Sequence, residues 1–215
     1  MFVLIKKIIK KFDRKVAFRS LCCAMVTVLA MSVAGFDAKC DEIRENVLRL
    51  HILANSDSET DQALKLKVRD RLLSVSETVF VGCETEEQAV KVAKENLKLF
   101  TDEAKKVIEL NGFSYDVKVE VADTMFETRD YENFSLPAGT YEALRVIIGS
   151  GKGHNWWCVM FPAVCLPSAS ENQGFSGVLK EDTAEIVEQP TRYKARFKVV
   201  EVFEKTKFKL SKIFN

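Results

Sequence analysis

The hydrophobic pattern of the chain begins with one uncharged apolar run. Seven lysine and arginine residues stand between Lys6 and Arg19, an apolar stretch follows from Leu21 to Ala34, and small residues close it. A basic lead, an apolar region of this length and a small-residue exit are typical of a secretory signal peptide. We therefore predict a signal peptide over residues 1–34 and export of the remainder. An uncleaved membrane anchor is the alternative.

Strand and helix periods alternate after this run. Residues 47–54 carry apolar side chains with polar interruptions two residues apart and predict a strand. Apolar residues at spacings of three and four then predict a helix over 59–80, with Ser58 and Asp61 as its capping residues. A second helix is predicted over 85–110.

The second half of the chain changes to a period of two. Residues 115–121 predict a half-buried strand, 125–131 a weaker one, and 141–148 and 155–161 two further strands. We expect the glycine-rich segment 149–153 to be a hairpin loop, because it lacks the spacing of a phosphate-binding loop. This order predicts an α+β fold: a mixed, mainly antiparallel sheet with two helices on one face, plus a separate basic C-terminal helix.

Composition divides the chain after the last predicted strand. Residues 40–165 are expected to form one α+β domain, 166–190 a linker and 191–215 a basic tail. The tail holds eight basic residues and two acids, a net charge of 8 − 2 = +6. Its apolar residues fall mostly on one helical stripe: Val199, Val202, Phe203, Leu210, Ile213 and Phe214. Such a helix either lies on an anionic membrane surface or docks its stripe on the body.

Charge and histidine content narrow the function classes. Without residues 1–34 the chain has 32 − 7 = 25 basic and 31 − 1 = 30 acidic residues, which does not suggest nucleic-acid binding. His154 and Cys158 would share a face of a strand and could form a thiol–histidine pair, but no third group orients the histidine. A zinc site there would lack its fourth ligand. We therefore predict no catalytic residue, no metal and no cofactor.

The cysteines fit an exported chain. Beyond the predicted signal peptide the chain has Cys40, Cys83, Cys158 and Cys165. Cys158 and Cys165 are close enough in sequence to close a small loop around Pro162, and exported proteins favour disulfides. This pair is therefore the candidate disulfide. Two buried thiols, which behave as small hydrophobic groups, are the alternative.

Both tryptophans of the chain stand side by side at positions 156 and 157. Adjacent residues of a strand point to opposite faces, so one indole should pack inside and the other should need a second layer or a partner. Because tryptophan is enriched at binding hot spots, we predict that Trp156 or Trp157, whichever faces outward, anchors a partner beside Asn155. A second candidate surface runs from Asn55 through Asp57 to Asp61.

Two segments resemble the stage II sporulation protein R family. One is Leu48–Asp70, and the other is residues 153–165 with the sequence Asn-Trp-Trp-Cys-Val-Met-Phe-Pro at its centre. The similarity extends from about Arg44 to Cys165. Ala163 stands where the family usually has a second proline, and the basic tail lies outside the similar region.

The resemblance implies a signalling protein of an endospore-forming bacterium, secreted from the forespore into the intermembrane space of the sporulation septum. There it would activate, by contact, a membrane-embedded aspartic protease of the mother cell, which removes the pro-sequence from pro-sigma-E. The family is not regarded as carrying catalytic residues of its own. The residues leave two alternatives. One is an exported thiol-dependent hydrolase that acts on cell-wall peptide, and the other is a septal membrane-surface protein held by the tail.

Overall fold

The computed structural model describes residues 14–164 and 174–214. The chain divides into two compact units, residues 1–39 and 40–215, and each is described by itself. Helix α2 (Arg14–Glu45) begins in the first unit and ends in the second. Its residues from Lys15 onward form a helix long and apolar enough to cross a membrane, a test that a signal sequence near an N-terminus also passes. Signal peptide and anchor therefore both stay predictions.

A four-stranded mixed sheet organises the second unit, in the order β2–β5–β1–β6. Its strands are β1 (Leu48–Leu53), β2 (Val117–Phe126), β5 (Gly139–Ile148) and β6 (Asn155–Phe161). β1 runs parallel to β5, whereas the β1–β6 and β2–β5 pairs are antiparallel. Two short strands, β3 (Arg129–Asp130) and β4 (Ser135–Leu136), pair separately. The predicted α+β class and the mainly antiparallel sheet are confirmed.

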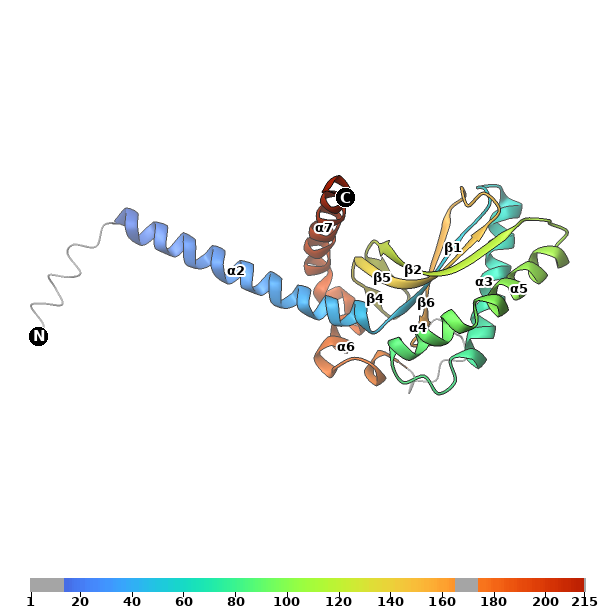
Figure 1. The fold of residues 1–215 in the computed structure, drawn as a ribbon. Helices are drawn as coiled ribbons and strands as arrows, with labels where there is room; N and C mark the ends of the chain where they lie inside the picture. Colours follow the sequence, from blue (N-terminus) through green and yellow to red (C-terminus); the bar gives the residue numbers. More distant parts are fainter. Residues whose placement is uncertain (1–13, 165–173, 215) are drawn as a thin grey trace, which may run out of the picture. The chain divides into compact units, whose positions relative to one another are not determined.

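Helices pack on one face of this sheet and enclose the hydrophobic core (Figure 1). They are α3 (Glu59–Val79), α4 (Glu86–Glu95) and α5 (Leu97–Leu110). Both predicted helices are present, but the second is broken at Asn96. The Asn96 side chain donates a hydrogen bond to the Val92 carbonyl at 2.8 Å, and its backbone leaves the helical region with φ −109° and ψ 16°. An asparagine that bonds to the preceding turn competes with helix continuation.

Segment 149–153 is not the hairpin loop that we expect, because β5 and β6 are not neighbours in the sheet. β1 lies between them, so the segment crosses the end of β1 to reach the edge strand. The Gly149 amide donates to the Asp116 carbonyl at 2.8 Å, and several other hydrogen bonds of the segment go to the loop that follows β1. The Gly153 amide donates to the Ala54 carbonyl at 2.9 Å, and the Ser150 amide donates to the Asn55 side chain at 3.0 Å. The parallel pairing of β1 with β5 therefore changes the role of this glycine-rich segment.

The chain after residue 173 is more ordered than the linker expected over 166–190. The short 3-10 helix η2 (Phe175–Gly177) precedes helix α6 (Glu181–Glu188). Thr183, Ile186 and Val187 of α6 are buried, and the Thr183 hydroxyl donates to the Glu42 carboxylate at 3.1 Å. A helix of eight residues is too short to give a clear period in the sequence. Residues 165–173 lie outside the described part of the chain.

The C-terminal tail forms helix α7 (Pro190–Phe214), as predicted, but it docks by a face that the sequence did not indicate. The buried side chains of α7 are Phe197, Val200, Glu201 and Glu204. The predicted apolar stripe instead points to solvent: Val199, Val202, Phe203, Leu210 and Ile213 are all exposed. The side chain of Phe214 lies outside the described part. Of the two alternatives for this stripe, docking on the body is therefore not the one that the structure supports.

The start of α3 provides a test of the helix prediction. The Ser58 side chain accepts a hydrogen bond from the Asp61 amide at 3.2 Å. We expect Ser58→Ala to lower the free energy of unfolding by about 1 kcal/mol, because an orphan amide loses its partner. Ser74→Ala, at an exposed position within α3, should change it by less than about 0.5 kcal/mol. Urea denaturation of the two variants measures both values, and equal losses would contradict the capping role.

Candidate partner-binding site

Two loops, residues 54–58 and 149–154, pack closely against each other at one end of the sheet. We call them the loop clasp. The backbones approach too closely for a side chain at Gly153, where an added Cβ would lie 2.2 Å from the Ser56 carbonyl oxygen. The Ser150 hydroxyl donates to the Asn55 carbonyl at 2.6 Å. Both family-like segments of the sequence contribute to the clasp. Segments about a hundred residues apart in the chain are therefore fixed against each other.

A buried carboxylate orders the first loop of the clasp. Asp61 is only 4% exposed, and one of its oxygens accepts hydrogen bonds from the Asn55 amide at 2.9 Å and the Ser56 hydroxyl at 2.6 Å. Burial alone would raise the pKa of Asp61, but the bonds from Ser56 and Asn55 outweigh it and hold the pKa below its usual value. Asn55 and Asp61, both predicted partner contacts, thus have structural bonds inside the clasp.

The rim of the clasp carries an exposed polar pair. The Asp57 carboxylate accepts a hydrogen bond from the His154 amide at 2.6 Å and also contacts the imidazole of His154. The two side chains are 55% and 80% exposed. The bond from the His154 amide is the main reason why the pKa of Asp57 lies below its usual value. Asp57, the third predicted residue of this loop, is therefore open to a partner.

The two tryptophans lie on opposite faces of the sheet, as predicted. Trp157 pairs in register with His51 and stacks on its ring at a centroid distance of 3.9 Å. Trp156 faces the helical side, where the Arg69 guanidinium lies 4.3 Å from the centre of its ring. Both indoles are half-buried, so neither is the fully outward residue that the alternation alone suggests. The sheet has a second packed layer beneath Trp157.

Trp157 lines a shallow depression that also includes Asn155 and His154. Its remaining lining residues are Met125, Glu127 and Arg129, and its volume is about 520 Å³. Asn155 is exposed, and the Arg129 guanidinium lies 5.5 Å from the centre of the Trp157 ring. We call this surface the Trp157 depression. It joins an aromatic ring, an amide and both signs of charge, a combination typical of protein recognition.

A buried basic layer, which the sequence analysis missed, supports Trp157. His51 is 5% exposed, and burial, helped by the nearby Arg145 and Arg49, lowers its pKa to about 4. Arg49 is completely buried, with its guanidinium 4.0 Å from the Phe126 ring centre, and it donates a hydrogen bond to the Tyr131 hydroxyl at 2.5 Å. The signal was the pair of basic residues at alternate positions of an otherwise apolar strand.

The positions of Cys158 and His154 do not favour a thiol–histidine catalytic pair. Cys158 is buried in the hydrophobic core on the helical side, whereas His154 is exposed on the clasp rim and engaged by Asp57. Among residues 14–164 and 174–214 there is no group of three histidine, cysteine or acidic side chains that could hold a metal ion. Cys165 lies outside the described residues, so the Cys158–Cys165 disulfide stays a prediction.

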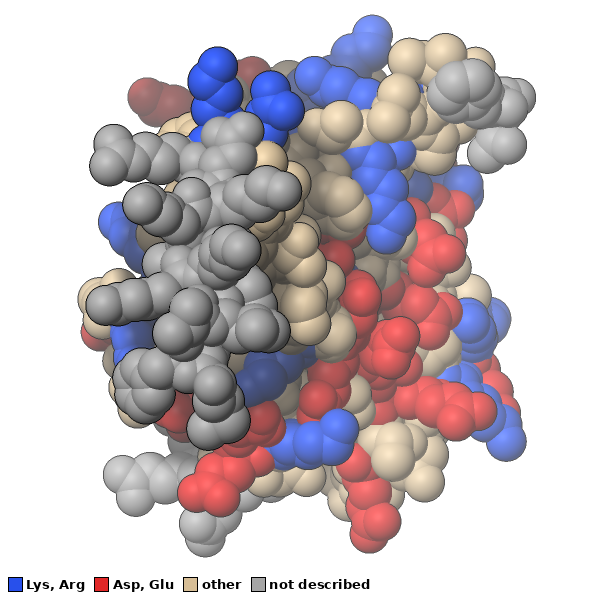
Figure 2. All heavy atoms as spheres, turned by 90° about the vertical axis from the view of Figure 1, so that its left-hand side faces the viewer, with Lys and Arg blue, Asp and Glu red and all other residues tan. Residues whose placement is uncertain are grey.

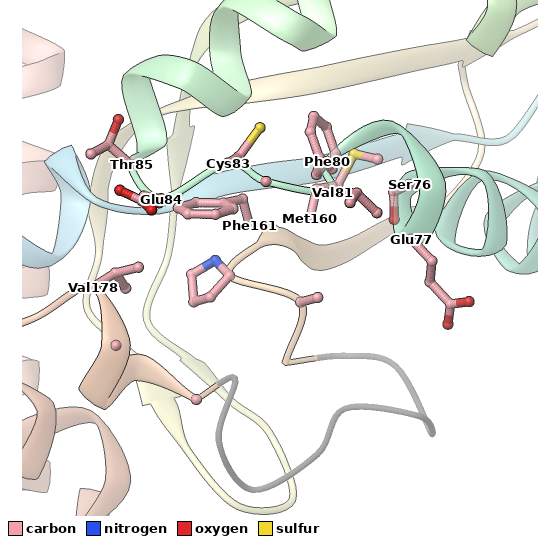
Figure 3. A pocket seen from close by; sticks show the side chains of 15 residues that line it. Ser76, Glu77, Phe80, Val81, Cys83, Glu84, Thr85, Met160, Phe161 and Val178 are labelled. Atoms are coloured by element: carbon pink, nitrogen blue, oxygen red, sulfur yellow. The ribbon is translucent and has the colours of Figure 1, made fainter.

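A second, apolar pocket lies at the other end of β6. Its volume is about 770 Å³, and Phe80, Cys83, Met160 and Phe161 are among its lining residues (Figure 3). Burial raises the pKa of the Cys83 thiol, which disfavours the reactive thiolate. None of the predicted partner-binding residues lines this pocket. The Trp157 depression is therefore the surface where the sequence predictions and the geometry meet.

Gly153 tests the loop clasp. In Gly153→Ala the new methyl group would overlap the Ser56 carbonyl, so we expect a loss of about 1–3 kcal/mol in the free energy of unfolding. Gly177→Ala is the matched control, since no heavy atom lies within 4 Å of its added Cβ. Urea denaturation should show a change below about 0.5 kcal/mol for the control. A similar effect of both substitutions would argue against the close approach.

The buried His51 predicts a pH dependence of stability. The unfolded imidazole binds a proton near pH 6.5 and the folded one only near pH 4, so the free energy of unfolding falls as the pH drops through this window. His51→Phe removes this contribution and keeps the stacked ring. Between about pH 7 and pH 4 we expect wild type to lose up to about 3 kcal/mol more than the variant. Parallel pH curves from denaturation experiments would contradict a neutral buried His51.

Comparisons with known proteins give matches to one family. A family model described as "Stage II sporulation protein R" matches residues 44–171, which include both loops of the clasp and the Trp157 depression. Stage II sporulation protein R of Bacillus subtilis (strain 168) is 34% identical over 168 residues, which cover 76% of this chain and 75% of the relative. No solved structure matches the chain. Because the family model spans more than half of the sequence, the chain belongs to the stage II sporulation protein R family.

Proposed function

We propose that this chain is an exported sporulation signal that activates a membrane-embedded aspartic protease by contact. The protease would process the pro-sigma-E precursor in the mother cell, and the contact would take place in the intermembrane space of the sporulation septum. Membership of the family supports a role in sporulation. The observation that carries the finer proposal is that the two family-like segments meet in one clasp, whose edge presents the Trp157 depression.

Activation by contact places a thermodynamic demand on this surface. A binding partner shifts a protease towards its active conformation only by binding that conformation more tightly than the inactive one. A shift from about 1% to about 99% active requires a difference of about 5.5 kcal/mol. A rigid surface supplies such a difference better than a loose one, because it loses less conformational freedom on binding. The clasp hydrogen bonds and the His51–Trp157 stack provide this rigidity.

The composition of the depression supports a protein partner. Trp157 offers a half-buried ring, Asn155 an exposed amide, and Glu127 and Arg129 opposite charges on its wall. Tryptophan and arginine are the residues on which binding energy most often concentrates. We therefore assign Trp157 as the anchor, with Asn155 and the Asp57–His154 rim as its polar surround. Trp156 packs on the helical side and is assigned a structural role.

The test is processing of the precursor in cells that co-express this chain, the protease and pro-sigma-E. We expect Trp157→Ala to abolish the shortened product, because an anchor of this kind contributes about 2 kcal/mol or more to binding. Trp156→Ala is the matched control: it removes an equally half-buried indole from the opposite face and should leave processing largely intact. Immunoblots for the precursor and for the exported chain measure both outcomes.

A milder variant, Asn155→Ala, separates an effect on binding from an effect on folding. Asn155→Ala truncates an exposed side chain, so its exported amount should equal that of wild type while the yield of shortened product drops. Normal processing in both Trp157→Ala and Asn155→Ala would remove the Trp157 depression from consideration. Cys158→Ala addresses the alternative: a thiol hydrolase would lose its effect, whereas a contact activator that still folds would keep it.

A further inference from the structure

Helix α7 carries an apolar stripe directly opposite its docked face. At 100° per residue, the buried Phe197 and Glu204 point towards the body, while Val199, Phe203 and Leu210 fall on the far side of the helix. The exposed fractions of these three stripe residues are 50%, 52% and 49%. Val202 and Ile213 continue the same stripe at 59% and 73%. We call these five residues the outer stripe.

Most of the large exposed apolar side chains described in residues 40–215 belong to the outer stripe. Of the nine large apolar side chains that are exposed within the described part of residues 40–215, six lie on α7. The others occur singly: Val81 lies in the turn after α3, and Leu99 and Leu110 lie on α5. Single exposed apolar residues are ordinary on protein surfaces, but a contiguous apolar patch marks an interaction site. From Thr206 to Ile213 every side chain is exposed, so none of the residues that the structure describes buries this end of the helix.

The charged side chains of α7 also differ between its docked face and its solvent-facing side. Both of its acids, Glu201 and Glu204, are buried at the docked face, where Glu201 holds Lys205 at 2.8 Å. Lysines border the outer stripe: the side chains of Lys198 and Lys207 are 71% and 65% exposed, and each reaches back to pair with one of these acids, at 3.2 Å and 3.5 Å. On the face shown in Figure 2, acidic side chains gather in the middle and lower part, with lysines and arginines above them and also beside them. The solvent-facing side of α7 is therefore apolar in the middle and cationic along its edges.

We propose that α7 lies on an anionic lipid bilayer, with the outer stripe in the boundary between headgroups and acyl chains. An apolar stripe edged by lysines is the arrangement by which helices bind in the plane of an anionic membrane. The docked face holds α7 on the body through Phe197, Val200 and the Lys205–Glu127 ion pair at 2.7 Å. Membrane contact would therefore orient the whole unit of residues 40–215. The proposal does not depend on the proposed function.

The test needs a local readout, because α2 of the full chain could itself bind lipid. Phe203→Trp places a reporter in the outer stripe, and its emission is compared with that of the wild-type chain in the presence of brominated lipids. In vesicles of phosphatidylcholine with phosphatidylglycerol we expect a blue shift and loss of most of the added emission. Phe197→Trp, on the docked face, should keep its added emission. Leu210→Trp is a second reporter should Phe203→Trp fail to fold.

Raised salt and lysine substitutions test whether the charge of α7 contributes to membrane binding. Raised salt should reverse most of the quenching, since the lysines act through charge that salt screens. A variant in which glutamine replaces Lys198, Lys207 and Lys209 should have the same effect. Full emission of both stripe reporters in anionic vesicles that carry the chain would overturn the proposal, as would failure of the chain to bind such vesicles. A blue shift that grows with protein concentration without lipid would overturn it too, in favour of a second copy of this chain on the stripe.

Discussion

The structure depends on the contact between the loop that follows β1 and the segment that joins β5 to β6. Because β1 lies between β5 and β6, the crossing segment must pass over the end of β1, and it is fixed there by hydrogen bonds from Ser150 and Gly153 to Asn55 and Ala54. A buried carboxylate, Asp61, holds the other side of this contact. Buried polar groups of this kind stabilise one arrangement strongly when each has a partner. The contact therefore sets where β6 begins, and with it the position of the tryptophan pair.

The two faces of the sheet are stabilised by different forces. On the helical face, β1, β5 and β6 contribute apolar side chains to a core shared with α3, α4 and α5. On the opposite face, Arg49 and His51 are buried among aromatic rings, with the guanidinium of Arg49 over Phe126. A cation over an aromatic ring recovers part of the free energy lost on burial. Trp157 belongs to this second, polar and aromatic layer, where its half-buried indole also packs against the buried ring of Phe126 at a centroid distance of 4.8 Å.

The sequence predicted the elements well and their contacts poorly. The helices from residue 59 and from residue 85, and strand β6 over 155–161, follow directly from hydrophobic period and capping residues. Strand order is a long-range property, so no local pattern indicates that β1 separates β5 from β6 or that segment 149–153 crosses between loops. Asn55 and Asp61 were predicted as partner contacts because exposed polar residues and internally bonded ones look the same in a sequence. The outer stripe of α7 was visible, but which face docks depends on Phe197 and Val200 meeting the body.

The central claim is that the edge of the clasp, beside Trp157, is the surface that touches the protease. Site-specific photo-crosslinking tests it directly, with a photoreactive phenylalanine at position 155 and, as control, at the exposed Thr78 of α3. In cells that make the protease, we predict a crosslinked adduct of chain and protease from position 155 and none from position 78. An adduct from position 78 alone, or equal adducts from both positions, would contradict the account.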